Sequence, residues 1–146
     1  VHFTTERSGT VVLTEGFARN VKHPACRPFF LDAWGLDWTT ASSYYREQNF
    51  KLNERNALVA ARRLQLPGKP DLNNGHTLVS SRAEDLVYGA RNTTRSVTWS
   101  EEKKRFEGPV LYAKIGEGAV GYLGYLAPDE AYVKLLLAMA SLEGGL

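Results

Sequence analysis

The chain has 146 residues, of which 43% are hydrophobic and 23% are charged, a composition typical of one globular domain with a core of ordinary size. Its 18 basic and 16 acidic residues leave a net charge of +2, which is too small for a dedicated nucleic-acid-binding protein. The single cysteine, Cys26, excludes an internal disulfide framework and a cysteine-rich zinc site.

Hydropathy and the N-terminal residues bear on location. No apolar run reaches the roughly 20 residues that a membrane-spanning helix needs, so we expect no membrane partner. A lone cysteine favours a reducing compartment, and we expect the protein in the cytoplasm. The first residues have neither a methionine nor the layout of a signal peptide, which indicates a trimmed or processed start.

The first part of the chain predicts a strand, a helix and a loop. Residues 10–13 form an apolar, β-branched run, typical of a parallel strand covered on both faces. Residues 29–34 are amphipathic and predict a short helix that ends at Gly35. An aromatic-rich loop is expected to follow, from Trp34 to Arg46.

The next segment predicts a strand followed by a helix. Residues 48–52 alternate polar and apolar side chains, as a half-exposed strand does. Asn53 is a suitable N-cap for a helix over residues 54–64. One face of that helix would carry Ala57, Leu58, Ala61 and Leu64.

The middle of the chain predicts short elements. Residues 77–80 indicate a strand, residues 85–89 a further short element, and part of residues 92–100 another strand. The charge run over residues 101–105 is typical of a solvated turn or helix face.

The last third predicts a hairpin and a helix. Residues 109–115 and 119–123 are apolar runs that flank Gly116-Glu117-Gly118, which favours two strands joined by a tight turn. Residues 128–142 predict a helix, with a proline and acidic residues at its start. Strands that alternate with helices indicate an α/β layered sheet.

Two of these segments resemble a known family. Residues 8–16 (Ser-Gly-Thr-Val-Val-Leu-Thr-Glu-Gly) resemble the glycine-bounded buried strand of ThuA-like domains, and residues 109–124 are similar to the closing hairpin of that family. Between them, the Trp-Gly-Leu-Asp-Trp segment at residues 34–38 resembles a pattern of fungal members. The chain therefore resembles a ThuA-like, class I glutamine amidotransferase-like domain.

This resemblance implies a fold and a partner. The fold would be a flavodoxin-like layered sheet, mostly parallel, with a C-terminal β-hairpin and helix, over residues 1–146 as a single domain. The resemblance also implies that the first βα units are missing, which would leave one edge of the sheet open. We therefore expect a homo-oligomer, or a partner chain that covers this edge.

The catalytic residues of the amidotransferase fold are not found at the matching positions. That chemistry uses a Cys on a sharp strand-to-helix turn, a His and a Glu. The chain has Thr14-Glu15-Gly16 at the first turn and Gly124-Tyr125-Leu126 after the hairpin, so glutamine hydrolysis by this route is not expected. A Cys26–His23 pair is an alternative nucleophile and base, against the simpler interpretation of Cys26 as a bystander.

Carboxylates suggest another chemistry. Glu15 is expected at the carboxyl end of a buried strand, which is the ligand side of such sheets. Asp37 and Glu47 bracket the aromatic loop, and a carboxylate pair would suit acid–base work on a sugar. Separate, solvated acids are the simpler interpretation. His76 is interpreted as a loop or strand-start residue rather than a base.

Aromatic residues in the predicted loop complete the candidate site. Trp38 and Tyr45, with their neighbours Trp34 and Tyr44, would offer flat faces to a sugar ring, and structural packing is the alternative. Arg46 would supply an anion contact. We therefore expect a ligand site at the residues Glu15, Trp38, Tyr45 and Arg46.

Three functions remain open at this point. The first is a domain that binds a small polar ligand, such as a carbohydrate, or a protein partner at the carboxyl ends of its strands. The second is a hydrolase of carbohydrate or amide substrates, and the third is an assembly subunit completed by another chain. No cofactor is expected, and the histidines lack the spacing of a metal site.

Overall fold

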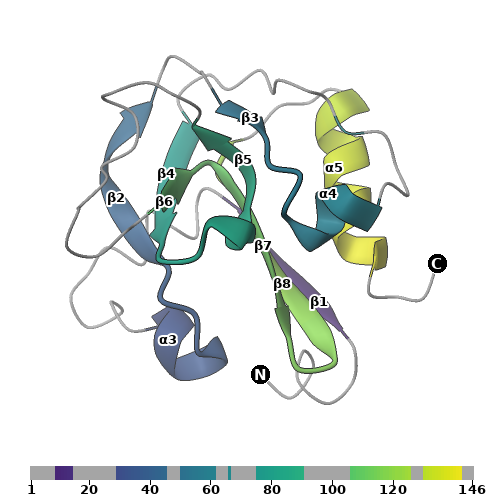
Figure 1. Ribbon diagram of the computed structural model, residues 1–146, viewed down its shortest axis with the longest axis horizontal. Helices are drawn as coiled ribbons and strands as arrows, with labels where there is room; N and C mark the ends of the chain where they lie inside the picture. Colours follow the sequence, from purple (N-terminus) through teal and green to yellow (C-terminus); the bar gives the residue numbers. More distant parts are fainter. Residues whose placement is uncertain are drawn as a thin grey trace.

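The computed structural model describes residues 9–14, 29–45, 50–61, 66, 75–90, 106–125 and 130–142 (Figure 1). In chain order the elements are the strand β1 (Thr10–Thr14), the helix α3 (Phe29–Trp34), the strands β2 (Thr39–Tyr45) and β3 (Phe50–Leu52), the helix α4 (Ala57–Ala61), the strand β4 (Gly75–Ser80), the short 3₁₀ helix η2 (Ala83–Asp85), the strands β5 (Leu86–Ala90), β6 (Phe106–Gly108), β7 (Val110–Ile115) and β8 (Gly118–Leu123), and the helix α5 (Glu130–Leu142).

The strands form two sheets. The larger sheet has the order β1-β8-β7-β5-β3, and the smaller has the order β2-β4-β6. Among the described strands, β1 and β8 are the one parallel pair. The other neighbours pair antiparallel.

The predicted flavodoxin-like, mostly parallel sheet is therefore wrong. The predicted hairpin is confirmed, with the turn Gly116-Glu117 between β7 and β8. However, these two strands lie in the middle of the larger sheet rather than at its end. A two-residue turn can join only antiparallel strands, whereas parallel neighbours need a crossover of about a dozen residues or more. The central hairpin thus gives the sheet its mixed character.

The two sheets meet where β6 runs into β7. Only Pro109 separates the two strands, so one stretch of chain contributes to both sheets. The Gly124 N–H donates to the Pro109 carbonyl (2.7 Å), and the His76 N–H donates to the Gly124 carbonyl (2.6 Å). These bonds connect the end of β8 to β4, and so they fix the smaller sheet against the larger one.

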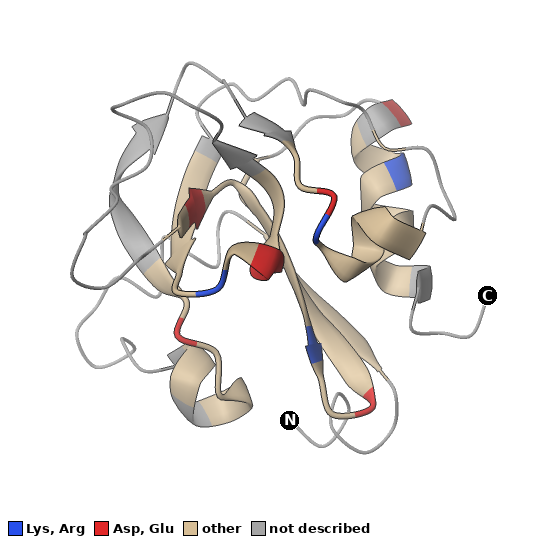
Figure 2. Ribbon diagram, in the orientation of Figure 1, with Lys and Arg blue, Asp and Glu red and all other residues tan. Residues whose placement is uncertain are grey.

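Charged residues of the described segments concentrate in turns and on the surface of α5 (Figure 2). On α5, Lys134 and Glu130 form an exposed ion pair one helical turn apart (3.0 Å). Such surface pairs contribute little to stability, so the core carries the fold.

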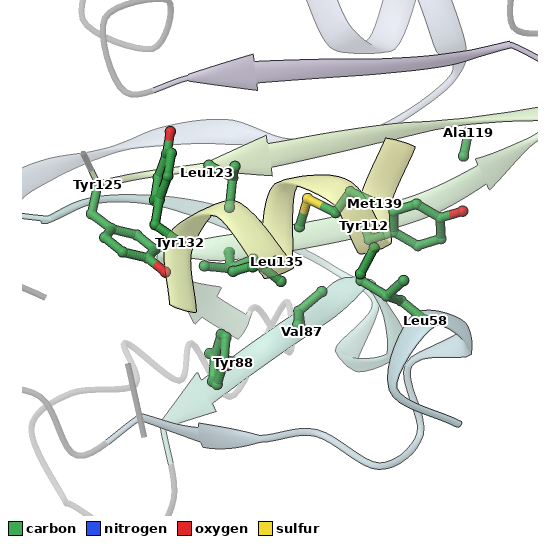
Figure 3. Packing of buried hydrophobic residues seen from close by; sticks show 12 residues of the cluster. Leu58, Val87, Tyr88, Tyr112, Ala119, Leu123, Tyr125, Tyr132, Leu135 and Met139 are labelled. Carbon is green, nitrogen blue, oxygen red and sulfur yellow. The ribbon is translucent and has the colours of Figure 1, made fainter. Parts of the chain in front are cut away.

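One hydrophobic cluster lies between the larger sheet and the helices α4 and α5 (Figure 3). Its buried members are Leu58, Val87, Tyr88, Val110, Tyr112, Ala119, Leu123, Tyr125, Tyr132, Leu135, Ala138 and Met139. On α5, Leu135 and Met139 face this cluster, while Val133 and Leu137 are about half exposed on the opposite side.

A second cluster lies on the other face of the larger sheet, towards α3 and the smaller sheet. Its buried members are Phe30, Leu36, Trp38, Leu78, Leu86, Leu111, Ala113, Ile115, Val120 and Tyr122. Strand β8 alternates between the two clusters, with Ala119 and Leu123 in the first and Val120 and Tyr122 in the second. The larger sheet is therefore covered on both faces.

Several local predictions are confirmed. The strand predicted at residues 10–13 is β1, and its parallel pairing is also confirmed. Helix α3 has the predicted bounds, and Gly35 ends it with a φ of 70° while its N–H donates to the Leu31 carbonyl (2.8 Å). Strand β4 covers the strand predicted at residues 77–80, and β5 lies where a short element of unstated type was expected, at residues 85–89. Strand β3 confirms residues 50–52, and α5 confirms the last helix from Glu130.

Two local predictions are wrong. Residues 39–45, predicted as loop, form β2. The helix predicted from Glu54 begins at Ala57, because Asn56 rather than Asn53 caps it, accepting a hydrogen bond from the Leu58 N–H (2.9 Å). Of the described residues of the expected apolar face, Leu58 is buried, while Ala57 and Ala61 are exposed. The segments 92–100 and 101–105, and Leu64, lie outside the described residues.

No helix in the described segments is long and apolar enough to cross a membrane. The same segments contain no cluster of three His, Cys, Asp or Glu residues that would hold a metal ion.

Candidate functional site

Two of the four predicted site residues, Glu15 and Arg46, lie outside the described part of the chain. So do the alternative residues Cys26, His23 and Glu47. For Tyr45, the structure places the backbone at the end of β2. Of the four residues of the predicted ligand site, only Trp38 is described together with its side chain.

Trp38 is a core residue. Its side chain is 1% exposed, its ring lies 5.5 Å from that of Phe30 between centroids, and its Nε1–H donates to Asp85 Oδ2 (2.9 Å). The packing alternative for Trp38 is therefore what the structure shows. A ligand could reach the indole only by displacing these contacts.

Trp38 and Tyr45 also lie far apart. Thr39, next to Trp38, pairs with Val79 at one end of β4, and Tyr45 pairs with Gly75 at the other end. Four residues of extended strand separate Val79 from Gly75, which is about 13 Å. The structure therefore does not bring these two aromatic residues together in one small-ligand site.

A buried carboxylate organises the region around Trp38. Asp85 is 2% exposed, and its Oδ2 accepts hydrogen bonds from Trp38 Nε1 and from the Ser80 hydroxyl (2.8 Å). Arg82 Nη2 donates to Asp85 Oδ1 (2.8 Å), and Arg82 Nε donates to Oδ2 (3.2 Å). Asp85 thus ties the start of β2 and the end of β4 to η2.

The hydrogen bonds around Asp85 indicate that this carboxylate has a structural role. Both oxygens of Asp85 are engaged by donors, and the Arg82 side chain is about half exposed. Ser80 has no base beside it on its own strand: His76 faces the same side of β4, but four residues away, about 13 Å. Among the described residues, the cluster therefore does not form a serine–histidine pair.

Asp37, one of the predicted acid–base residues, binds main chain. Its two carboxylate oxygens accept from the Ser81 N–H (3.2 and 3.1 Å), and Oδ1 lies 3.4 Å from the Ser80 hydroxyl. This arrangement closes the turn after β4. Asp85 was missed as a site residue because its burial depends on Trp38, 47 residues earlier in the chain.

A second buried carboxylate lies in the smaller sheet. Glu107 is 3% exposed and accepts a hydrogen bond from the Thr77 hydroxyl on the neighbouring strand. The adjacent His76 is fully buried, and its carbonyl accepts from the Tyr122 hydroxyl (2.7 Å). The interpretation of His76 as a strand-start residue is confirmed.

Three tyrosines gather where β8 ends. The rings of Tyr125 and Tyr132 meet edge to face with centroids 5.2 Å apart, and Tyr88 lies near them (Figure 3). Burial raises the pKa of the Tyr132 hydroxyl, while burial and then the neighbouring Tyr125 raise that of Tyr88. These hydroxyls therefore stay protonated in the folded protein well into the alkaline range.

We expect stability to fall as the pH rises above about 10, the ordinary tyrosine pKa. A raised pKa in the folded state contributes stability that is fully present below the unfolded pKa and is lost as the pH rises towards the folded one. Each such tyrosine adds a slope of up to about 1.4 kcal/mol per pH unit. Urea denaturation across this range would measure the slope, which Tyr88→Phe should make shallower. An unchanged slope in that variant would contradict the assignment.

The edge strand β1 has a defined hydrogen-bonding direction. Thr10 lies opposite Ala119, whose N–H donates to the Gly9 carbonyl (3.1 Å). In a pair of parallel strands, a residue such as Ala119 bonds to the residues before and after the one that lies opposite it. It follows that Gly9, Val11 and Leu13 turn their main-chain groups towards β8.

The remaining residues of β1 have outward-directed main-chain groups. The main-chain N–H and C=O groups of Thr10, Val12 and Thr14 are directed away from β8. Within the described segments β1 has no second neighbouring strand, and its residues are half-buried apart from the exposed Thr14. Among the described strands, the outer edge of β1 is therefore unpaired.

No protein-family model, curated protein or solved structure matches the chain. The resemblance to ThuA-like domains therefore stays a prediction.

Proposed function

We propose that this domain is an assembly module that binds a strand of another polypeptide along the outer edge of β1. The observation that carries the proposal is the row of outward main-chain donors and acceptors at Thr10, Val12 and Thr14. Such an edge is a ready template for strand addition, in which main-chain hydrogen bonds supply affinity.

The composition of β1 supports this proposal. Natural proteins that keep a sheet edge in water protect it with charged residues, proline, bulges or a covering segment. Strand β1 reads Thr-Val-Val-Leu-Thr, without a charge or a proline (Figure 2), and its register with β8 is regular. An edge without charge, proline or bulge is suited to being covered by a partner strand.

Ligand binding at the carboxyl ends of β1 and β8 is a second candidate. Thr14, which precedes Glu15, lies opposite Leu123 at this end of the sheet. Tyr45 pairs with Gly75, whose neighbour His76 bonds to Gly124 just after β8. A small polar ligand here would use Glu15, Tyr45 and Arg46, without Trp38. Its test is a carbohydrate titration with a Tyr45→Ala control.

The assembly proposal is tested with a labelled peptide of alternating threonine and valine, flanked by lysines for solubility. Because the Val12 N–H points outward, Val12→Pro removes a donor for the added strand while it leaves the ladder with β8 intact. Val12→Thr keeps the N–H and the β-branched shape, and it is the matched control. We expect the wild type and Val12→Thr to bind the peptide, and Val12→Pro to bind at least about tenfold more weakly.

Two checks make this result interpretable. Equal thermal unfolding midpoints for the two variants would show that Val12→Pro is folded. A peptide in which prolines replace the valines should not bind, since it lacks the donors of a strand. Equal peptide affinity of the wild type and Val12→Pro, or a wild type that is monomeric and does not bind the peptide at millimolar concentration, would refute the proposal.

A further inference from the structure

We infer that the strand that completes this edge is β1 of a second copy of the chain, antiparallel and related by a two-fold axis at Val12. This inference rests on the proposed function, because it names the occupant of the same edge. Three properties of β1 lead to it.

The first property is the self-complementary sequence of β1. With a two-fold axis at Val12, Val12 lies opposite its own copy, Val11 lies opposite Leu13, and Thr10 lies opposite Thr14. Apolar residues therefore meet apolar residues, and threonine meets threonine, a pair that cross-strand hydroxyl bonds favour.

The second property is the hydrogen-bonding register. The residues whose main-chain groups point outward are Thr10, Val12 and Thr14, which are symmetric about Val12. In an antiparallel pair, residues that exchange both N–H···O bonds alternate with residues that exchange none. The axis at Val12 places each outward residue opposite another outward residue. A shift by one residue would place outward residues opposite inward ones and lose these bonds.

The third property is charge. Neither β1 nor the segment of β8 beside it, from Ala119 to Leu123, carries a charged side chain. A two-fold axis always brings a surface against its own copy, so a charged edge would repel itself. The neutral edge of β1 has no such repulsion.

The two-fold axis would be normal to the sheet. The larger sheets of the two copies would therefore continue into each other, with both α5 helices on the same face.

Cysteine cross-linking tests this register, in a background that carries Cys26→Ser. Opposite residues that exchange both bonds have Cα atoms about 5.5 Å apart, within the disulfide range of about 4.4–6.8 Å. Val12→Cys should therefore cross-link to its own copy under mild oxidation. Thr10→Cys should not cross-link to itself, because the two copies of residue 10 are four residues apart along the strands, about 13 Å. A mixture of Thr10→Cys and Thr14→Cys should cross-link.

Light scattering on the wild type, Val12→Thr and Val12→Pro supplies the second readout. We expect a concentration-dependent dimer of the wild type and Val12→Thr, with a dissociation constant at least about tenfold higher for Val12→Pro. A wild type that stays monomeric at millimolar concentration yet binds the threonine–valine peptide would overturn the second-copy inference and leave the assembly proposal standing. A monomer that does not bind the peptide would overturn both. A dimer that Val12→Pro does not weaken, or that lacks the cross-linking pattern, would show that another surface pairs the copies.

Discussion

Replacing Asp85 with alanine is expected to lower the free energy of unfolding by about 3 kcal/mol. The substitution removes the acceptor of two buried donors, the Trp38 indole N–H and the Ser80 hydroxyl. A buried donor without a partner costs about 1–3 kcal/mol, whereas the half-exposed Arg82 guanidinium can turn to water. Urea denaturation followed by tryptophan fluorescence would measure the loss.

The neighbouring Glu84 provides the matched control. Its side chain is exposed, so Glu84→Ala should change stability by no more than about 0.5 kcal/mol. A double-mutant cycle with Trp38→Phe should be non-additive, because both changes remove the same hydrogen bond. A loss below about 1 kcal/mol for Asp85→Ala would indicate that the carboxylate cluster does not hold the fold.

Replacing Gly124 with alanine is expected to cost about 3 kcal/mol or more, or to prevent folding. An added Cβ would lie 2.1 Å from the His76 carbonyl oxygen and 2.6 Å from that of Pro109. Both atoms belong to the backbone, and both carbonyl groups lie where the two sheets meet, so neither can move aside cheaply. The Gly124 N–H also bonds to Pro109, and an alanine would push this junction apart.

Gly35→Ala is the comparison that separates crowding from backbone strain. Gly35 has a φ of 70°, but an added Cβ there would meet no atom within 4 Å. Strain alone should therefore cost about 1 kcal/mol. Thermal and urea unfolding would compare the stability lost in Gly124→Ala with that lost in Gly35→Ala. A Gly124→Ala variant no less stable than Gly35→Ala would contradict the tight junction.

The elements that depend on a few neighbouring residues could be predicted from the sequence. The glycine turn at residues 116–117 predicts the hairpin, and Gly35 predicts the end of α3, because each needs a backbone conformation that glycine favours. Strand β2 was missed because its sequence, Thr-Thr-Ala-Ser-Ser-Tyr-Tyr, lacks an apolar alternation and its register with β4 is irregular.

The arrangement of the strands and the buried polar residues could not be predicted in this way. The mostly antiparallel strand directions of the larger sheet follow from the central position of the β7–β8 hairpin. That position is set by pairing between residues far apart in the sequence. Asp85 and Glu107 look like ordinary surface acids in the sequence, but they are buried and bonded to residues far away in the chain, Trp38 just before β2 and Thr77 of β4. Of the candidate site, the strand β1 was predicted, but the direction of its outward hydrogen-bonding groups needed the register of β1 against β8.

The passage of the chain from β6 through Pro109 into β7 has a consequence for how the protein loses its structure. A protein with two sheets can in principle open one of them while the other persists. Here the residues 106–115 form two strands joined by a bend at Pro109, and the two strands belong to different sheets. The Gly124 bond to Pro109 lies at this bend. Fraying of either sheet pulls on the same stretch of chain and so disturbs the other. The two sheets therefore make up one cooperative folding unit.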